Sequence, residues 1–82
     1  MVAKNAPVPT LLPDALIRQL FGARLAVMLR DREISQAALA EQLEVDRSTV
    51  SRICSGERSA KPGQIRSICI LLNIDPALLL GL

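Results

Sequence analysis

Polar side chains with hydrogen-bond donors recur between residues 47 and 55 at spacings that place them on one face of a short helix. At about 100° per residue, this face holds Arg47, Ser48, Ser51, Arg52 and Ser55. The opposite face holds Val50, Ile53 and Cys54. The polar face offers two guanidinium groups and three hydroxyls and contains no carboxylate. Such groups suit phosphate oxygens and the edges of nucleic-acid bases.

A second short amphipathic pattern comes just before this one. It covers residues 36–43 and places Leu39, Ala40 and Leu43 on one side. Glu44 and Val45 then form a tight turn into the polar helix. Two short helices in this arrangement, the second with an exposed polar face, are typical of a helix-turn-helix.

The charge distribution favours a polyanionic partner such as double-stranded DNA. The 82 residues carry a net charge of only +2, but the basic residues are concentrated in one region. Residues 45–66 contain five basic and two acidic side chains, whereas the only charged side chain in residues 67–82 is that of Asp75. The basic excess therefore falls on the polar helix and on the segment that follows it.

The composition disfavours an enzyme and a metal site. The chain has no His, Tyr or Trp and only two cysteines, Cys54 and Cys69, which cannot complete a tetrahedral zinc shell. Cys54 also lacks a base that would activate it as a nucleophile. No segment reaches the roughly 18 apolar residues of a membrane span. We therefore expect a cytoplasmic protein with reduced, buried thiols and no cofactor.

Capping residues and apolar periodicity predict an all-α chain. Expected helices cover about residues 14–32, 36–43, 47–55, 62–72 and 76–80. Their N-caps are expected at Asp14, Ser35 and Asp46, with Pro62 in the first turn of the fourth helix and Asp75 capping the fifth. Residues 1–13 hold three prolines and are expected to form a flexible arm before a single domain at 14–82.

Two glycines have predicted structural roles. Gly22 interrupts the first helix, where it either lets a neighbour approach closely or kinks the helix. Gly56 suits a left-handed stop at the end of the third helix.

Residues 18–80 resemble the Cro and phage-repressor (XRE) type of helix-turn-helix domain. The matching features are Gly22, Leu25, Ser35–Gln36, Leu39–Ala40, Val45, the helix Arg47–Ile53, Gly56, Pro62 and Leu72–Ile74. The resemblance implies a lambda-repressor-like fold of five helices. The family often has Gly in the turn where this chain has Glu44, so a left-handed backbone there would cost about 1 kcal/mol.

The resemblance and the docking geometry of the motif assign two kinds of DNA contact. Base reading is expected of residues on the second helix of the motif, namely Arg47, Ser48 and Arg52. Phosphate binding is expected of Gln36, Thr49, Ser51, Ser55, Arg58 and Lys61.

The expected function is a sequence-specific transcription regulator, a repressor that binds a palindromic operator as a homodimer. An antitoxin or accessory regulator that also binds a protein partner is the alternative. A helical adaptor whose motif is only structural is a third possibility.

The dimer interface is expected at the C-terminal end, where apolar residues exceed what a small core can cover. These residues are Ile70, Leu71, Leu78, Leu79 and Leu82. Alternatively, these leucines fold back over the first helix and complete the core of a monomer.

Overall fold

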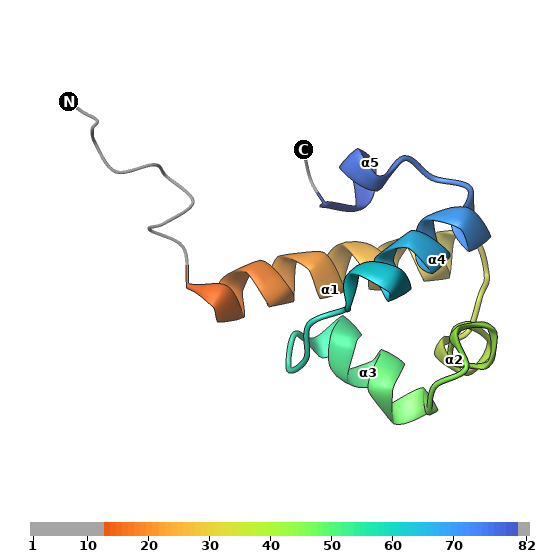
Figure 1. Cartoon of the computed structure of the whole chain (residues 1–82), viewed down its shortest axis with the longest axis horizontal. Helices are drawn as coiled ribbons and strands as arrows, with labels where there is room; N and C mark the ends of the chain where they lie inside the picture. The colour runs from red at the N-terminus through yellow and green to blue at the C-terminus, as the bar shows by residue number, and fades with distance from the viewer. Residues whose placement is uncertain (1–12, 81–82) are drawn as a thin grey trace.

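The computed structural model describes residues 13–80 as five helices (Figure 1). They are α1 (Asp14–Asp31), α2 (Gln36–Leu43), α3 (Arg47–Ser55), α4 (Pro62–Leu72) and α5 (Pro76–Leu80). The all-α prediction is confirmed, and only the end of the first helix differs, by one residue. Residues 1–12 of the expected arm and residues 81–82 of the expected domain lie outside the described residues.

Helix α3 packs against both α1 and α2, while α5 packs against α1 and α4. In Figure 1, α2 and α3 lie below α1, and α5 lies above it. The space between the helices is filled by one aliphatic core: Leu25, Leu29, Leu39, Ala40, Val50, Ile53, Ile68, Cys69, Leu72 and Leu79. Because every helix contributes to this core, the orientation of α3 depends on the packing of the whole chain.

Most helix ends follow from local hydrogen bonds. The Ser35 hydroxyl accepts a bond from the Ala38 amide at 3.0 Å, and the Asp75 carboxylate accepts one from the Ala77 amide at 2.9 Å. Gly56 ends α3 in the left-handed region at φ 87°. These three caps confirm the sequence prediction.

The predicted N-cap at Asp14 was wrong, and the predicted N-cap at Asp46 is confirmed in position only. Asp14 is the first helical residue rather than the N-cap, because the Pro13 carbonyl already accepts bonds from the amides of Leu16 and Ile17. Asp46 holds the N-cap position of α3 but makes no side-chain capping bond. Only its carbonyl takes part, by accepting a bond from the Thr49 amide at 2.9 Å.

Gly22 lies where α1 closely approaches α3. A Cβ atom at Gly22 would lie 2.5 Å from the carbonyl oxygen of Cys54 and even closer to that of Ile53. Helix α1 continues without a break through this position. Of the two predicted roles, close approach is therefore the one observed.

Glu44 ends α2 with a left-handed backbone, at φ 59° and ψ 43°. Its amide donates to the Glu41 carbonyl at 3.2 Å, and the next amide, that of Val45, donates to Ala40 at 3.0 Å. These bonds turn the chain from α2 into α3. The turn therefore has the left-handed backbone that glycine favours, and the Glu44 side chain makes this conformation strained.

We expect Glu44→Gly to raise the free energy of unfolding by about 0.5–1 kcal/mol, because glycine adopts this conformation without steric cost. Glu41→Gly is the matched control, because Glu41 is also exposed but lies inside α2. It should lower stability by about 1 kcal/mol. Urea unfolding of the three proteins measures both changes, and a loss of stability in Glu44→Gly would contradict the strain.

Candidate nucleic-acid interface

The turn at Glu44 holds α3 against α2 so that one side of α3 is buried and the other is exposed. Val50 and Ile53 lie in the core on the buried side, as the sequence predicted. The exposed side presents Arg47, Ser48, Ser51 and Arg52. No acidic residue occurs within α3. The predicted polar face is thus a continuous surface that can donate hydrogen bonds to an anion or a base edge.

Thr49 does not belong to this surface, which corrects the prediction of a phosphate contact. Its side chain is only 9% exposed, between the exposed Ser48 and the buried Val50. A side chain with so little exposed surface is poorly placed for a phosphate contact.

The structure also argues against a phosphate contact at Ser55. The Ser55 hydroxyl lies 3.0 Å from the Arg52 carbonyl oxygen and 3.2 Å from a carboxylate oxygen of Glu57. A hydroxyl has one proton to donate, and both neighbours are acceptors. The nearby carboxylate would also repel a phosphate. The carboxylate of Glu57, two residues after Ser55, could have predicted this contact from the sequence, but the helical pattern ends at Ser55 and did not include it.

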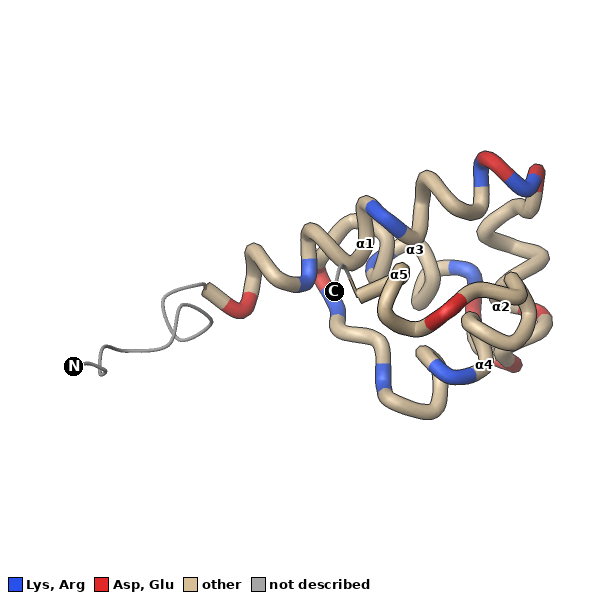
Figure 2. Tube along the Cα trace, turned by 90° about the horizontal axis from the view of Figure 1, so that it is seen from above, with Lys and Arg blue, Asp and Glu red and all other residues tan. Residues whose placement is uncertain are grey.

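The loop after α3 is tied to the backbone of the polar helix. The amides of Glu57 and Arg58 both donate to the Arg52 carbonyl, at 2.9 and 3.2 Å. At the other end of the loop, the Lys61 amide donates to the Gln64 side chain at 2.8 Å. Figure 2 shows basic positions on α3 and along this loop. Arg58 is therefore an exposed cation whose backbone is bonded to α3, and Lys61 is an exposed cation at the start of α4.

Gln36 is the first residue of α2 and is partly buried. The first amides of a helix have no partners within the helix and carry a partial positive charge. Gln36 thus lies at a helix start that suits a phosphate, as the resemblance implies.

Arg18 is a residue that sequence reasoning missed. Its Nε atom donates to the Gly56 carbonyl oxygen at 3.1 Å, which joins α1 to the end of α3. The two residues are 38 positions apart, so no local pattern predicts this bond. Arg18 therefore helps to fix the end of the polar helix and the start of the basic loop.

Cys54 lies half-buried on the inner side of α3. Burial raises the pKa of the Cys54 thiol, so the thiol is protonated at neutral pH. Residues 13–80 contain no group of three or more side chains that could ligate a metal ion. Within the same residues, no helix has the length and hydropathy needed to cross a membrane.

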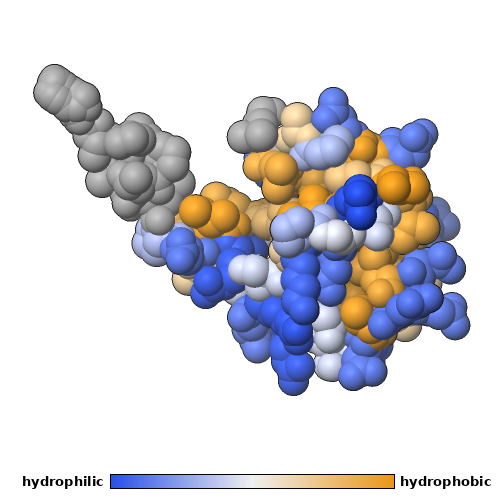
Figure 3. Space-filling view, viewed as in Figure 1, coloured by the Kyte–Doolittle hydropathy of each residue, from blue (hydrophilic) through white to orange (hydrophobic). Residues whose placement is uncertain are grey.

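Large apolar side chains are exposed on α4 and α5. Ile70 is 72% exposed, and Leu71, Leu78 and Leu80 are also exposed. Figure 3 shows hydrophobic surface over α4 and α5 and mainly hydrophilic surface over α3. We call the exposed side chains of Ile70, Leu71 and Leu78 the C-terminal apolar surface.

Leu79 corrects the predicted dimer interface, because its side chain is fully buried in the core. Helix α5 packs against α1 and directs Leu79 inward. The alternative that the leucines fold back is therefore right for Leu79 and wrong for its exposed neighbours. Leu82 lies outside the described residues.

Comparisons with known proteins agree with this architecture. A family model described as a helix-turn-helix domain matches residues 20–81. No curated protein sequence matches the chain.

The solved structures that are similar to this one include those of two regulators. The restriction-modification controller protein C.AhdI from Aeromonas hydrophila is 31% identical, with a TM-score of 0.70, over 76% of this chain and 94% of that protein. The clp gene regulator ClgR from Corynebacterium glutamicum is similar in two structures. One is 25% identical over 79% of this chain and 84% of ClgR, with a TM-score of 0.73. The other is 26% identical over 84% and 73%, with a TM-score of 0.77.

Proposed function

This chain belongs to the helix-turn-helix family of XRE-type DNA-binding transcription regulators, and on that premise we propose that it is a sequence-specific repressor. The exposed, acid-free face of α3 is the observation that carries the proposal. The names of the similar proteins, a controller protein and a gene regulator, also support a role in gene control.

Helix α3 enters the major groove with its N-terminal residues deepest. Arg47 and Ser48 occupy that end, and Arg52 lies about one turn further along the same exposed side. A guanidinium group can bind the O6 and N7 atoms of guanine together, which is the commonest specific contact in the major groove. We therefore assign base reading to Arg47, Ser48 and Arg52.

Phosphate binding is assigned to four residues around this helix: Gln36, Ser51, Arg58 and Lys61. Gln36 is at the start of α2, and Ser51 is exposed on α3. Arg58 and Lys61 lie on the loop whose backbone is bonded to Arg52 and Gln64. Contacts of this kind fix the position of the protein on the duplex and add affinity for any sequence.

Selection of bound sequences from a random DNA pool, followed by a gel shift at several salt concentrations, tests this function. We expect one preferred sequence with twofold symmetry and a steep loss of affinity as salt rises. Enrichment of no sequence would contradict sequence-specific binding. A helical adaptor would give no specific band at any salt concentration.

We further propose that the protein binds a palindromic operator as a homodimer through the C-terminal apolar surface. One recognition helix reads only a few base pairs, whereas a twofold dimer reads two half-sites about 34 Å apart. The surface lies on α4 and α5, which leaves the exposed face of α3 free for DNA. Large apolar side chains exposed together on neighbouring elements often mark an interface.

Ile70→Glu should weaken the dimer by about 2 kcal/mol or more, because it places a charge on the most exposed apolar residue of that surface. Leu16→Glu is a matched control on an exposed leucine at the start of α1. Sedimentation equilibrium at micromolar concentrations should show a monomer for Ile70→Glu and a dimer for the control. A wild-type monomer, or an unchanged dimer in Ile70→Glu, would exclude this interface.

A further inference from the structure

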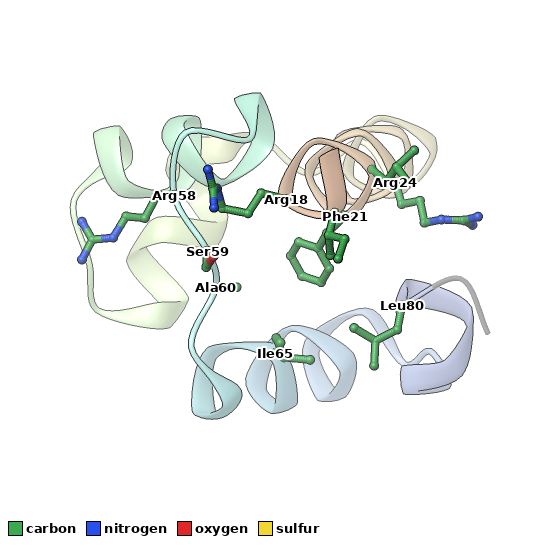
Figure 4. A pocket seen from close by; sticks show the side chains of 10 residues that line it. Arg18, Phe21, Arg24, Arg58, Ser59, Ala60, Ile65 and Leu80 are labelled. Carbon is green, nitrogen blue, oxygen red and sulfur yellow. The ribbon is translucent and has the colours of Figure 1, made fainter. Parts of the chain in front are cut away.

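A cavity of about 470 Å³ opens between the first half of α1, the loop after α3, α4 and α5 (Figure 4). Its apolar lining consists of Ile17, Leu20, Phe21, Ala60, Ile65 and Leu80. Ile17 and Leu20 of α1 are 45% and 53% exposed, so large apolar side chains on this wall are open to solvent. The volume falls within the range of small-molecule sites, about 300–1,000 Å³.

The charged side chains around this cavity are all positive. Arg18, Arg24 and Arg58 contribute to the lining, and no carboxylate does. In Figure 4, Phe21 and Leu80 point into the space, whereas the guanidinium groups of Arg24 and Arg58 extend outward at opposite ends. The site thus combines an apolar interior with a cationic rim.

The positive rim decides between two occupants. A second copy of this chain, related by a twofold axis through the same face, would bring the positively charged rims of the two copies together. Like charges across an interface cost free energy. A ligand with an apolar body and a negative head group instead buries its body among the side chains and places its charge beside Arg24.

We propose that this cavity binds a single-chain amphiphile with an anionic head group, such as a medium-chain carboxylate. The tail contacts Phe21, Ile65 and Leu80, and the head group lies at the arginine rim. This site is separate from the exposed face of α3, because none of Arg47, Ser48 and Arg52 lines it.

Occupancy of the cavity should lower DNA affinity, a consequence that rests on the proposed function. The loop that carries Arg58 forms one wall of the cavity, and Arg18 bonds the Gly56 carbonyl at the start of that loop. Arg58 is a proposed phosphate contact, so a ligand that packs against this wall acts on the same loop as the DNA. Because the two binding equilibria are linked, bound DNA then lowers the affinity for the amphiphile by the same factor.

The single aromatic residue of the chain gives a direct assay without DNA. Phe21 is the only Phe, and the chain has no Tyr, Trp or His, so all aromatic ring signals of an unlabelled protein come from a residue that lines this cavity. Titration with decanoate below its micelle concentration should shift these signals to saturation, with a dissociation constant below about 1 mM. Acetate, which lacks the tail, should cause no saturable shift. Decylammonium, which reverses the head charge, should bind at least about tenfold more weakly.

Matched variants test the two halves of the site. Arg24→Gln should weaken decanoate about fivefold, whereas Arg30→Gln, an exposed arginine of the same helix outside the cavity, should not. Leu20→Asn should weaken it more than Val27→Asn, because Val27 is similarly exposed on α1 but does not line this cavity. Circular dichroism checks that each variant is folded.

Failure to saturate, equal binding of decylammonium, or no effect of Leu20→Asn in a folded protein would each overturn the site. The effect on DNA binding is measured by the gel shift with and without decanoate. We expect the affinity for DNA to be about fivefold lower when decanoate saturates the cavity. If the protein binds no DNA while the Phe21 signals still saturate, the proposed function fails and the amphiphile site stands.

Discussion

Gly22→Ala is expected to lower the free energy of unfolding by about 3 kcal/mol or more. The added Cβ atom would fall 2.5 Å from the Cys54 carbonyl oxygen and closer still to that of Ile53. Both obstacles are backbone atoms of α3, so no side-chain rotation relieves the overlap. Helices α1 and α3 must separate, and the core between them loses contact. The gain of about 1 kcal/mol in helix propensity is smaller than this cost.

Gly63→Ala is the matched control for this substitution. Gly63 also lies within a helix, but a Cβ atom there would have no neighbour within 4 Å. The change should therefore leave stability unchanged or raise it by up to about 1 kcal/mol. Urea unfolding monitored by circular dichroism compares the two variants. Equal midpoints would show that the close approach at Gly22 does not limit stability.

The helix ends could be predicted because their causes are local. Ser35 bonds an amide three residues later, and Asp75 bonds one two residues later. Gly56 needs only its own backbone freedom. The N-cap was predicted at Asp14, but it is Pro13. The preference for Asp at N-caps concerns side chains, whereas here the backbone carbonyl of Pro13 accepts the first hydrogen bonds of the helix.

The errors in the predicted surface arose where burial depends on distant segments. Leu79 and Leu80 are neighbours with the same side chain, yet one is fully buried and the other is exposed, because α5 meets α1 along only one side. Thr49 is only 9% exposed although it lies next to the exposed Ser48. The bond between Arg18 and Gly56 joins two segments that no sequence spacing relates. Periodicity assigns a face, but the packing of other helices determines how far that face is covered.

Arg52→Ala is expected to weaken binding to the selected operator by about 1–3 kcal/mol and to relax its specificity. The side chain is exposed on the acid-free face of α3, where a guanidinium can reach the edge of a guanine. The structural bonds at this position use the Arg52 carbonyl, which accepts from Glu57, Arg58 and Ser55. Alanine keeps that carbonyl, so the loop should stay in place and the loss should report the guanidinium alone.

Lys61→Ala separates base reading from general attraction to DNA. Lys61 is also exposed and basic, but it lies on the loop before α4 rather than on α3. Its loss should weaken operator and random DNA to a similar extent and lower the salt slope by about one. Arg52→Ala should weaken the operator more than random DNA, as should Arg47→Ala. Equal losses on both DNAs for the two α3 variants would assign these arginines to phosphates, and the sequence preference would then come from other residues.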